Sequence, residues 1–451
     1  MSRRSSYESY DSIKTRTRKP RCQSASQIAK NVKSFELWAA HQECEEVAYD
    51  DMPEDMRATV QGVFDVVGRL PAEWLSKSSE AATRIREVLP ADLLEFVRKA
   101  GKAVPDLFGT QVSTDDSKHL LSELQVVFSA WKRLRKMRKS SRKWSEADYA
   151  ANVYNVIRSP AIQKGDYRAQ CSIALAQPLS LSRIKTSDLR VLNAKTASPD
   201  ASIFIPARLV KDLAYSSKSP YKVLKSLTKG KTSVSGSIGG ESDFRYQATP
   251  CTKLPDAQCF EFASTYWEDK KHAYIEDAHR QNRMATASAV RQLHALHINA
   301  PIFGVVWAQG TVRAHVDWWE TNSKTGQVMN RSAAYAGTNP SSRRTSGVFH
   351  EWNLEEPADI LQVYLLIKNL DTWTVNGFLE RVAEGVQQLA VDVLHEGHRL
   401  VPWRRKGDLA KVIGTNAQEI KAEGTPRPSF SVTPSSSPPK HKSRKRVPRS
   451  R

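Results

Sequence analysis

The sequence predicts an α/β (α+β) fold in which a mixed central sheet is flanked by helices. The short apolar run at residues 259–263 is typical of a buried strand. Residues 272–297 then repeat apolar side chains at helical spacing. Residues 301–306 and 312–318 have the composition of strands, and the turn at residues 308–311 joins them. These segments predict a strand, a helix and a strand that continues through a hairpin into another strand.

Composition divides the chain into four parts. Residues 1–25 are rich in Ser, Arg and Lys and predict a disordered basic arm. Residues 26–142 predict a helical module, and residues 143–406 carry the mixed α/β domain. Residues 407–451 lose the periodic pattern and end in a Ser, Pro and basic tail that we expect to be disordered.

The helical module contains three periodic segments, at residues 55–70, 91–100 and 118–137. The last of them ends in a strongly basic run at residues 132–139, which suits a helix C-terminus electrostatically. The same run could lie along a phosphate backbone or could be a solvated face. The module is either a separate unit or a brace on the α/β domain.

Further elements are expected in the α/β domain. Residues 144–158 predict a helix that begins with acidic side chains, and residues 202–206 predict a strand. Residues 225–240 predict a basic loop, and residues 322–347 a long polar loop. Two closing helices are expected at the positions 356–369 and 375–394.

The net charge of +20 predicts attraction to polyanions, most simply nucleic acid. The five cysteines form no CxxC pair, which argues against a disulfide framework or a zinc ribbon and fits a reducing compartment. No apolar run is long enough for a membrane span, and the N-terminus has no signal core. The basic stretch at residues 442–446 suggests nuclear import, so we expect a nuclear, otherwise cytoplasmic, protein that is not secreted.

Two carboxylates draw attention because of their setting. Glu261 lies inside the apolar run, where a charge is costly unless it is paired or binds a metal. Asp243 lies in residues 241–247, which predict a second strand joined to the first through a hairpin at residues 249–255. Acids on adjacent strands can share one divalent cation, so Asp243 and Glu261 are the expected ligands of Mg²⁺ (or Mn²⁺).

This order of residues resembles the PD-(D/E)XK nuclease superfamily, in particular the divergent domains that are common in fungal genomes. The resemblance covers roughly residues 144–319 and extends the nuclease-like domain to residues 143–406. It implies a restriction-endonuclease-like sheet. Matched by position, Glu146 is the acid of the first helix, Asp243 and Glu261 are the metal ligands, and Gln281 is the glutamine of the following helix.

The sequence departs from the family at the lysine. In the family a Lys stands two residues after the acid, but here that position is Ala263. The resemblance then implies a relocated lysine, Lys270 or Lys271. A second register, residues 255–256 with residues 268–270, matches the motif literally. We expect the first register, because Glu268 follows Tyr-Trp at a strand end and is not flanked by a buried run.

Other chemistry is not supported by the sequence. It has no P-loop, no Rossmann glycine fingerprint, no kinase signature and no Gly-x-Ser-x-Gly elbow. A metal set drawn from His294, His297, His315 and Asp317 matches no strong zinc spacing.

The expected function is metal-dependent cleavage of phosphodiester bonds in nucleic acid, with DNA favoured over RNA. The alternative is a catalytically inactive nuclease fold that binds nucleic acid or a protein, and Ala263 is the residue that favours it. A third hypothesis is a structural adaptor built on the helical module.

Overall fold

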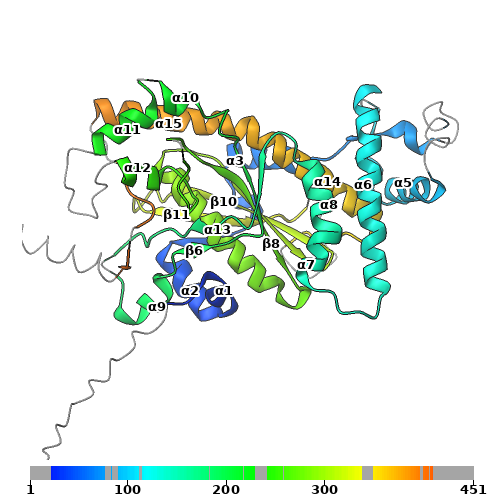
Figure 1. The fold of residues 1–451 in the computed structure, drawn as a ribbon, viewed down its shortest axis with the longest axis horizontal. Coiled ribbons are helices and arrows are strands. Elements are labelled where there is room, and N and C mark those ends of the chain that lie inside the picture. Colours follow the sequence, from blue (N-terminus) through cyan, green and yellow to red (C-terminus); the bar gives the residue numbers. More distant parts are fainter. Residues whose placement is uncertain are drawn as a thin grey trace, which may run out of the picture.

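The computed structural model of the chain describes residues 22–76, 83, 90–110, 114–181, 183–216, 218–228, 241–256, 258–337, 349–396, 400–405 and 407–409. It confirms the mixed α/β class, because a large mixed sheet is flanked by helices on both faces (Figure 1). Residues 1–21 of the basic arm, most of the basic loop at residues 225–240, and residues 410–451 of the tail with its import signal lie outside these residues. Among the helices described, none is long and apolar enough to cross a membrane.

The central sheet has eight strands in the order β1-β11-β10-β9-β8-β7-β4, with β12 paired to β10. Their bounds are β1 (Cys44–Val47), β4 (Asp166–Ala169), β7 (Ala201–Phe204), β8 (Ala263–Lys270), β9 (Ile302–Ala308), β10 (Thr311–Thr321), β11 (Val328–Ala334) and β12 (Trp352–Asn353). Strands β4, β7 and β8 are antiparallel neighbours, whereas β8 and β9 are parallel. Two short pairs lie outside this sheet: β2 (Leu70–Pro71) with β3 (Phe108–Gly109), and β5 (Ile173–Ala174) with β6 (Thr196–Ala197).

The helices cluster before β4, between β7 and β9, and at the end of the described chain. They are α1 (Ala25–Lys30), α2 (Val32–His41), α3 (Glu54–Phe64), α5 (Ala91–Ala103), α6 (Thr114–Lys139), α7 (Glu146–Tyr149), α8 (Asn155–Ala161), α9 (Leu189–Leu192), α10 (Asp212–Tyr215), α11 (Pro220–Thr228), α12 (Glu241–Gln247), α13 (Ile275–Ala295), α14 (Pro357–Val375) and α15 (Gly377–His395). A π-helical turn, Ala150–Tyr154, joins α7 to α8, and short 3₁₀ turns lie at Tyr49–Asp51, Ala72–Leu75, Pro105–Leu107, Thr186–Asp188 and His272–Tyr274.

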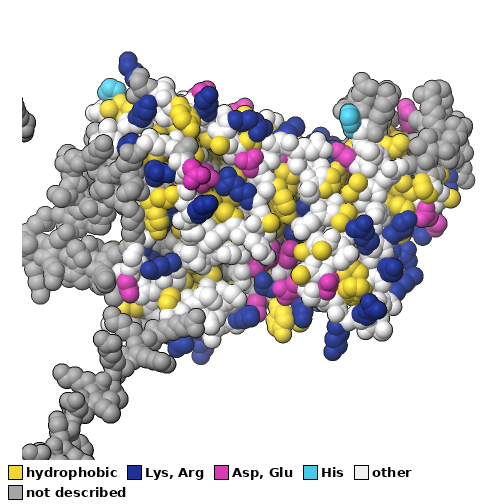
Figure 2. All heavy atoms as spheres, viewed as in Figure 1, with side chains coloured by type: hydrophobic (Ala, Val, Ile, Leu, Met, Phe, Trp, Pro, Cys, Tyr) yellow, Lys and Arg dark blue, Asp and Glu magenta, His cyan; other side chains and the backbone are white. Residues whose placement is uncertain are grey.

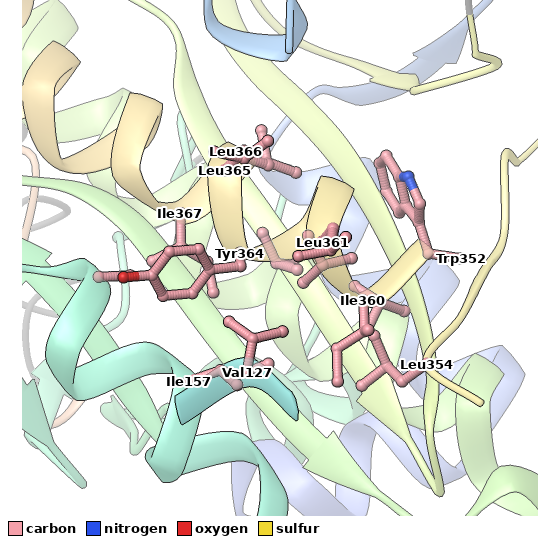
Figure 3. Close-up of a cluster of buried hydrophobic side chains, with 14 of the residues drawn as sticks. Val127, Ile157, Trp352, Leu354, Ile360, Leu361, Tyr364, Leu365, Leu366 and Ile367 are labelled. Atoms are coloured by element: carbon pink, nitrogen blue, oxygen red, sulfur yellow. The ribbon is translucent and has the colours of Figure 1, made fainter. Parts of the chain in front are cut away.

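Each face of the sheet has its own apolar core. On one face, α13 packs on β8, β9 and β10, and buried side chains of α15 join the same core. On the other face, α14 packs on β7 and β8 and is surrounded by α3, α5, α6 and α8. Figure 3 shows this second core, where Tyr364 and Ile367 of α14 lie near Val127 of α6 and Ile157 of α8. The two cores fix β8 in the interior of the molecule.

The expected helical module, residues 26–142, is part of the same sheet and helix layers. Strand β1 extends the large sheet by pairing in parallel with β11. Helices α3, α5 and α6 all pack against α14. In the described residues this segment therefore braces the sheet, which is the second of the two arrangements considered from the sequence.

The strands expected around Asp243 and Glu261 are wrong. Residues 241–247 form the helix α12, in which Phe244 and Gln247 are buried one helical turn apart, so no hairpin joins them to the next strand. Residues 259–262 precede the ladder, and Phe260 and Phe262 pack into the core without strand pairing. The strand itself begins at Ala263 and continues to Lys270. The expected long loop also contains a strand, β11.

The remaining elements of this region agree with the sequence. Helix α13 and strands β9 and β10 occupy the expected positions, and so do the closing helices α14 and α15. Strand β7 lies at the strand expected at residues 202–206. These segments have long or strongly periodic apolar patterns, which specify their structure locally.

Gly304 in β9 permits a close contact between α13 and β10. A Cβ atom there would lie 2.1 Å from His315 Nε2 and 2.3 Å from Asn282 Oδ1, which hydrogen-bond to each other at 2.8 Å. We expect Gly304→Ala to lower the free energy of unfolding by about 1–3 kcal/mol, because the buried pair must separate. Urea unfolding would measure this.

The matched control is Gly62→Ala in α3, where a Cβ atom would meet nothing within 4 Å. An exposed helix glycine exchanged for alanine is expected to raise the free energy of unfolding by about 0.5–1 kcal/mol. Equal effects of the two substitutions would contradict the proposed role of Gly304.

Candidate active site

Strand β8 carries three consecutive charged residues at its C-terminal end. Side chains alternate between the two faces of a strand. Trp267 belongs to the core on the α14 face, and Tyr266 belongs to the core on the α13 face. Glu268 therefore shares the α13 face with Lys270, whereas Asp269 points to the α14 side. Glu268 is 1% exposed and Asp269 is 5% exposed, so both acids are deeply buried.

A second acid is placed beside Glu268 by strand pairing. Ala201 of β7 is opposite Trp267 of β8, which brings the preceding residue, Asp200, to the end of β8. The backbone N–H of Asp200 donates to the Trp267 carbonyl oxygen at 3.0 Å. In return, the Asp200 carboxylate accepts a hydrogen bond from the Asp269 N–H at 2.7 Å.

A third acid reaches the same strand end from the first helix of this region. Ser145 caps α7 through its side chain, and Glu146 is the first residue of the helix. The Glu146 Oε1 atom accepts a hydrogen bond from the backbone N–H of Lys271 at 3.3 Å. We call Glu146, Asp200, Glu268 and Lys270 the acid site.

The environment of the two strand-end acids, Glu268 and Asp200, disfavours negative charge. Burial raises the pKa of Glu268 well above its usual range, and the nearby charge of Asp200 raises it further. Burial and the charge of Asp269 also raise the pKa of Asp200. One oxygen of Glu268, Oε1, accepts from the Lys270 ammonium at 2.7 Å, but Oε2 is buried without a hydrogen-bond partner. A bound cation would satisfy this oxygen and stabilise both carboxylates.

Lys270 is the positive member of the acid site. Burial lowers its pKa, but the charges of Glu268, Asp200 and Glu146 outweigh burial and the pKa is raised. Its ammonium group is therefore charged at neutral pH and lies against the acids on the exposed side of the sheet end.

An ion pair supports the strand from the opposite face. The guanidinium of Arg158 on α8 donates to both oxygens of Asp269, at 2.5 and 3.0 Å. It also lies over the Trp307 ring, 4.2 Å from the centroid, and close to Trp267. The bidentate pair fixes the backbone of residue 269, whose N–H holds Asp200.

The described residues separate Glu261 from the lysines expected to act with it. Asp243 lies in the helix α12, and its side chain is outside the described ones. Glu261 accepts from Arg168 at 2.8 Å and from the Thr249 hydroxyl, so its charge is compensated. It precedes β8, whereas Lys270 ends it, and eight strand residues span roughly 20–25 Å. Glu261 is therefore remote from Lys270 and Lys271.

The other residues expected from the sequence lie at different distances from the acid site. Glu146 and Lys270 do meet at the acid site, and Lys271 contributes its backbone N–H. Gln281 lies nearly buried in α13, and within the described part of the chain no hydrogen bond joins it to Glu268 or Lys270. Asp256, from the literal register, is exposed and lies in the segment before β8, outside any strand.

Asp200 is the member of the acid site that the sequence does not single out, whereas Glu268 appears only in the second register, which is not the expected one. The signal existed, because Pro199-Asp200 directly precedes the expected strand at residues 202–206. The helices α10, α11 and α12 lie between the two acids in the chain and conceal their pairing.

The histidine set is not a metal centre in this structure. His315 and Asp317 belong to a buried network: Asp317 contacts His315 Nδ1 at 3.4 Å and Arg283 Nε at 3.3 Å. Although burial opposes it, the charges of His315 and Arg283 lower the pKa of Asp317 to about 2. His294 packs edge-on against Trp319, away from this network, while His297 is within 3.7 Å of Asp392.

The residues of the acid site fit a magnesium ion with few protein ligands. Mg²⁺ in phosphoryl-transfer sites is held by one or two carboxylates together with waters and phosphate oxygens. Asp200 and Glu268 supply two carboxylates and an orphaned oxygen. Over the described ranges, no group of three or more His, Cys, Asp or Glu side chains is arranged as a complete metal site.

Comparison with known proteins adds no relative to this picture. No protein-family model matches the chain, and no curated protein is significantly similar to it.

Proposed function

We propose that this protein is a metal-dependent nuclease whose active centre is the acid site. One observation carries the proposal: β7 and β8 place Asp200 beside Glu268, with Lys270 two residues further on the same face of β8. Two carboxylates can hold one divalent cation, and an ammonium group beside them can stabilise the negative charge that develops on a phosphate during hydrolysis.

The order of elements around the site supports the same proposal. A helix with Glu146 is followed by the antiparallel strands β4, β7 and β8, then by α13 and the parallel strand β9. This order resembles the core of the PD-(D/E)XK superfamily and its restriction-endonuclease-like sheet. The motif is then literal, as Pro199-Asp200 with Glu268-Asp269-Lys270, and no relocated lysine is required. The motif keeps Glu268 and Lys270 from the second register considered in the sequence, but its aspartate is Asp200 and not Asp256.

Each residue of the acid site has a definite role in the proposal. Asp200 and Glu268 would hold Mg²⁺ or Mn²⁺, which supplies Lewis acidity and a water of lowered pKa when bound. Lys270 keeps Glu268 oriented through its 2.7 Å contact and presents positive charge where negative charge develops on the phosphate oxygens. Glu146, less buried than the strand acids, lies at the rim of the site and can accept a hydrogen bond from an attacking water.

A basic surface next to the acid site supports a nucleic-acid substrate. We define the basic ridge as the eight cations of the α6 C-terminus and its connector to α7: Lys132, Arg133, Arg135, Lys136, Arg138, Lys139, Arg142 and Lys143. All eight are exposed. In the described part of the chain, carboxylates pair with two of them, Lys132 and Arg138. Figure 2 shows Lys and Arg side chains over the lower part of α6, with acidic side chains between them and the middle of that face.

The ridge leads directly to the acid site. Trp144 donates its indole N–H to the Met137 carbonyl oxygen at 3.0 Å, which ties the connector to the end of α6. Glu146 follows two residues later. A groove of about 630 Å³ between α5 and α6 runs along the ridge, with Phe96, Phe128 and Trp131 among its lining residues. A phosphate backbone on the ridge would pass the acid site.

Neutralising cations of the basic ridge is expected to weaken the binding of duplex DNA. It should also make the binding affinity less sensitive to salt concentration. Replacing Arg133, Arg135, Lys136 and Lys139 by Gln removes four exposed cations that lack a carboxylate partner among the described residues. The slope of log Kobs against log salt should become shallower by about 3 to 4, because each lost phosphate contact removes about one counterion. Fluorescence anisotropy at several salt concentrations measures the slope.

The control removes the same charge elsewhere, by exchanging the exposed Lys30, Lys33, Lys211 and Lys218 for Gln. Its slope should stay close to that of the unchanged protein. Equal losses in both variants would show that binding depends on total charge and not on the ridge.

The test of the proposed function is a cleavage assay with the full chain. Plasmid, linear and single-stranded DNA and RNA would be incubated in Mg²⁺ or Mn²⁺, with chelator as the control. The proposal expects cleavage, with DNA as the better substrate, that chelator abolishes. Binding without cleavage in either metal would instead support the inactive nuclease fold as a nucleic-acid-binding module. Nuclear localisation stays a prediction, since its signal lies outside the described residues.

A further inference from the structure

Two free cysteines face each other on the sheet face that carries Glu268. Cys171 follows β4 and Cys251 precedes β8, and their Sγ atoms are 3.3 Å apart although 80 residues separate them in the chain. Cys251 also forms an isolated β-bridge with Ile173, which holds the two segments together. The contact is therefore fixed by backbone pairing on both sides.

The two thiols differ in access. Cys251 is buried, with 4% of its surface exposed, whereas Cys171 is half-buried. Arg168 of β4 lies beside the pair, with its Nη1 atom 3.9 Å from the Cys251 Sγ and 2.8 Å from Glu261. A small solvent-borne reagent can thus reach Cys171, and the second sulfur is held behind it.

The contact between the two thiols and the nearby Arg168 give Cys171 and Cys251 different pKa values. The hydrogen bond from the Cys251 thiol, together with the charge of Arg168, lowers the pKa of Cys171 to about 7 in spite of burial. The same hydrogen bond, together with burial, raises the pKa of Cys251. Near neutral pH, Cys171 therefore carries much of the thiolate, which is the nucleophilic form.

We propose that Cys171 and Cys251 are a redox-active dithiol that a hydroperoxide converts to a disulfide. A disulfide has a sulfur–sulfur distance of about 2.05 Å, so the sulfurs need to approach by little more than about 1 Å. The other cysteines of the described chain, Cys22, Cys44 and Cys259, have no second sulfur in contact. The pair is independent of the nuclease proposal.

The reaction balances in two steps. The Cys171 thiolate attacks one peroxide oxygen, the S–O bond forms, the O–O bond breaks, and the released hydroxide takes a proton to become water. The resulting sulfenic acid is then attacked by the Cys251 sulfur. The S–S bond forms, the S–O bond breaks, and the leaving hydroxide takes the Cys251 proton. Two thiols and one hydroperoxide molecule, for H₂O₂, yield one disulfide and two waters.

The position of the pair links it to the acid site. Cys171 follows Gln170, whose backbone N–H donates to the Asp200 carbonyl oxygen at 3.0 Å. A covalent bond at Cys171 therefore restrains the chain that contacts the residue before β7. Since the bond closes a loop of 80 residues, it should also raise the Tm of the full chain.

The experiment treats the full chain with H₂O₂ and counts thiols before and after. We expect the five cysteines to fall to three titratable thiols, with a peptide that links Cys171 to Cys251 and is released by dithiothreitol. Cys171→Ser should lose this cross-link, and Cys259→Ser, which removes a nearby cysteine, should retain it. Cys251→Ala, which removes the hydrogen-bond donor, should raise the pKa of Cys171 measured from its rate of alkylation against pH.

Two results would overturn the proposal. One is that Cys171 and Cys251 remain free thiols at an H₂O₂ concentration that oxidises the exposed Cys22. The other is oxidation of Cys171 to sulfinic acid without any cross-link to Cys251. Circular dichroism of each variant shows whether a missing cross-link reflects loss of the fold. The rise in the Cys171 pKa of Cys251→Ala supports the proposal only if the spectrum is unchanged, because unfolding would also move this pKa from about 7 toward the free-thiol value of about 8.5.

Discussion

Replacing Glu268 by glutamine is expected to lower the rate of metal-dependent cleavage by about 100-fold or more. A metal ion supplies several kcal/mol of transition-state stabilisation, and each 1.36 kcal/mol lost slows the reaction about tenfold. Glutamine preserves the size of the side chain but removes the negative charge that would hold the ion beside Asp200. Single-turnover cleavage of labelled DNA in Mg²⁺ measures the loss.

Glu261→Gln is the matched control, because it makes the same exchange before the opposite end of β8, beside Arg168. It should leave the cleavage rate nearly unchanged. Cleavage lost in Glu261→Gln and retained in Glu268→Gln would contradict the assignment and return the site to the register expected from the sequence.

The same substitution has a predictable effect on stability. Burial raises the pKa of Glu268 in the folded state above its value in the unfolded chain. As pH rises from the unfolded-state pKa toward the folded-state pKa, ionisation favours the unfolded chain and the folded state loses stability. Glutamine cannot ionise, so Glu268→Gln should be at least as stable as the unchanged protein at pH 7–8. The variant therefore separates loss of chemistry from loss of fold, and urea unfolding at several pH values checks it.

The second large effect is expected at the ion pair below the acid site. Asp269→Ala should lower the free energy of unfolding by about 3–5 kcal/mol, because it leaves the buried charge of Arg158 without its carboxylate. Arg158 is 1% exposed and is enclosed by Trp267 and Trp307, so water cannot replace the lost contacts. The midpoint and slope of urea unfolding give the change.

An exposed pair provides the comparison. Asp92→Ala removes the partner of Lys132, at 3.4 Å, where both side chains are more than half exposed. Solvent screens this pair, so the loss should be below about 1 kcal/mol. Losses of similar size in the two variants would contradict a structural role for the buried pair.

The elements that sequence alone predicted well are those with a local signature. Helices α13, α14 and α15 and strands β9 and β10 have apolar patterns that define their type without reference to the rest of the chain. The errors fell on short segments. Residues 241–247 satisfy a helical and a strand interpretation equally in sequence, and contacts of Phe244 with Tyr221 and Phe260 select the helix.

The candidate site differs from the expected one for a related reason. The apolar run at residues 259–263 predicts a buried strand, whereas β8 begins at Ala263 and carries buried charges at its end. Those charges are tolerated because Arg158 pairs with Asp269 and Lys270 pairs with Glu268. Both ion pairs depend on the folded conformation of the chain, so the sequence alone does not show them. Glu146 and Lys270 are among the residues that the family resemblance implies. Asp200 is not, because its partner on β8 lies beyond three intervening helices.

Mn²⁺ binding to the full chain, followed by electron paramagnetic resonance without nucleic acid, tests whether the acid site holds the metal. We expect one bound ion per chain that is lost in Asp200→Asn and in Glu268→Gln. We also expect that Asp243→Asn and Glu261→Gln bind the ion as the unchanged protein does. Binding that survives both changes at the acid site, or that disappears with Asp243 or Glu261, would contradict this assignment of the metal.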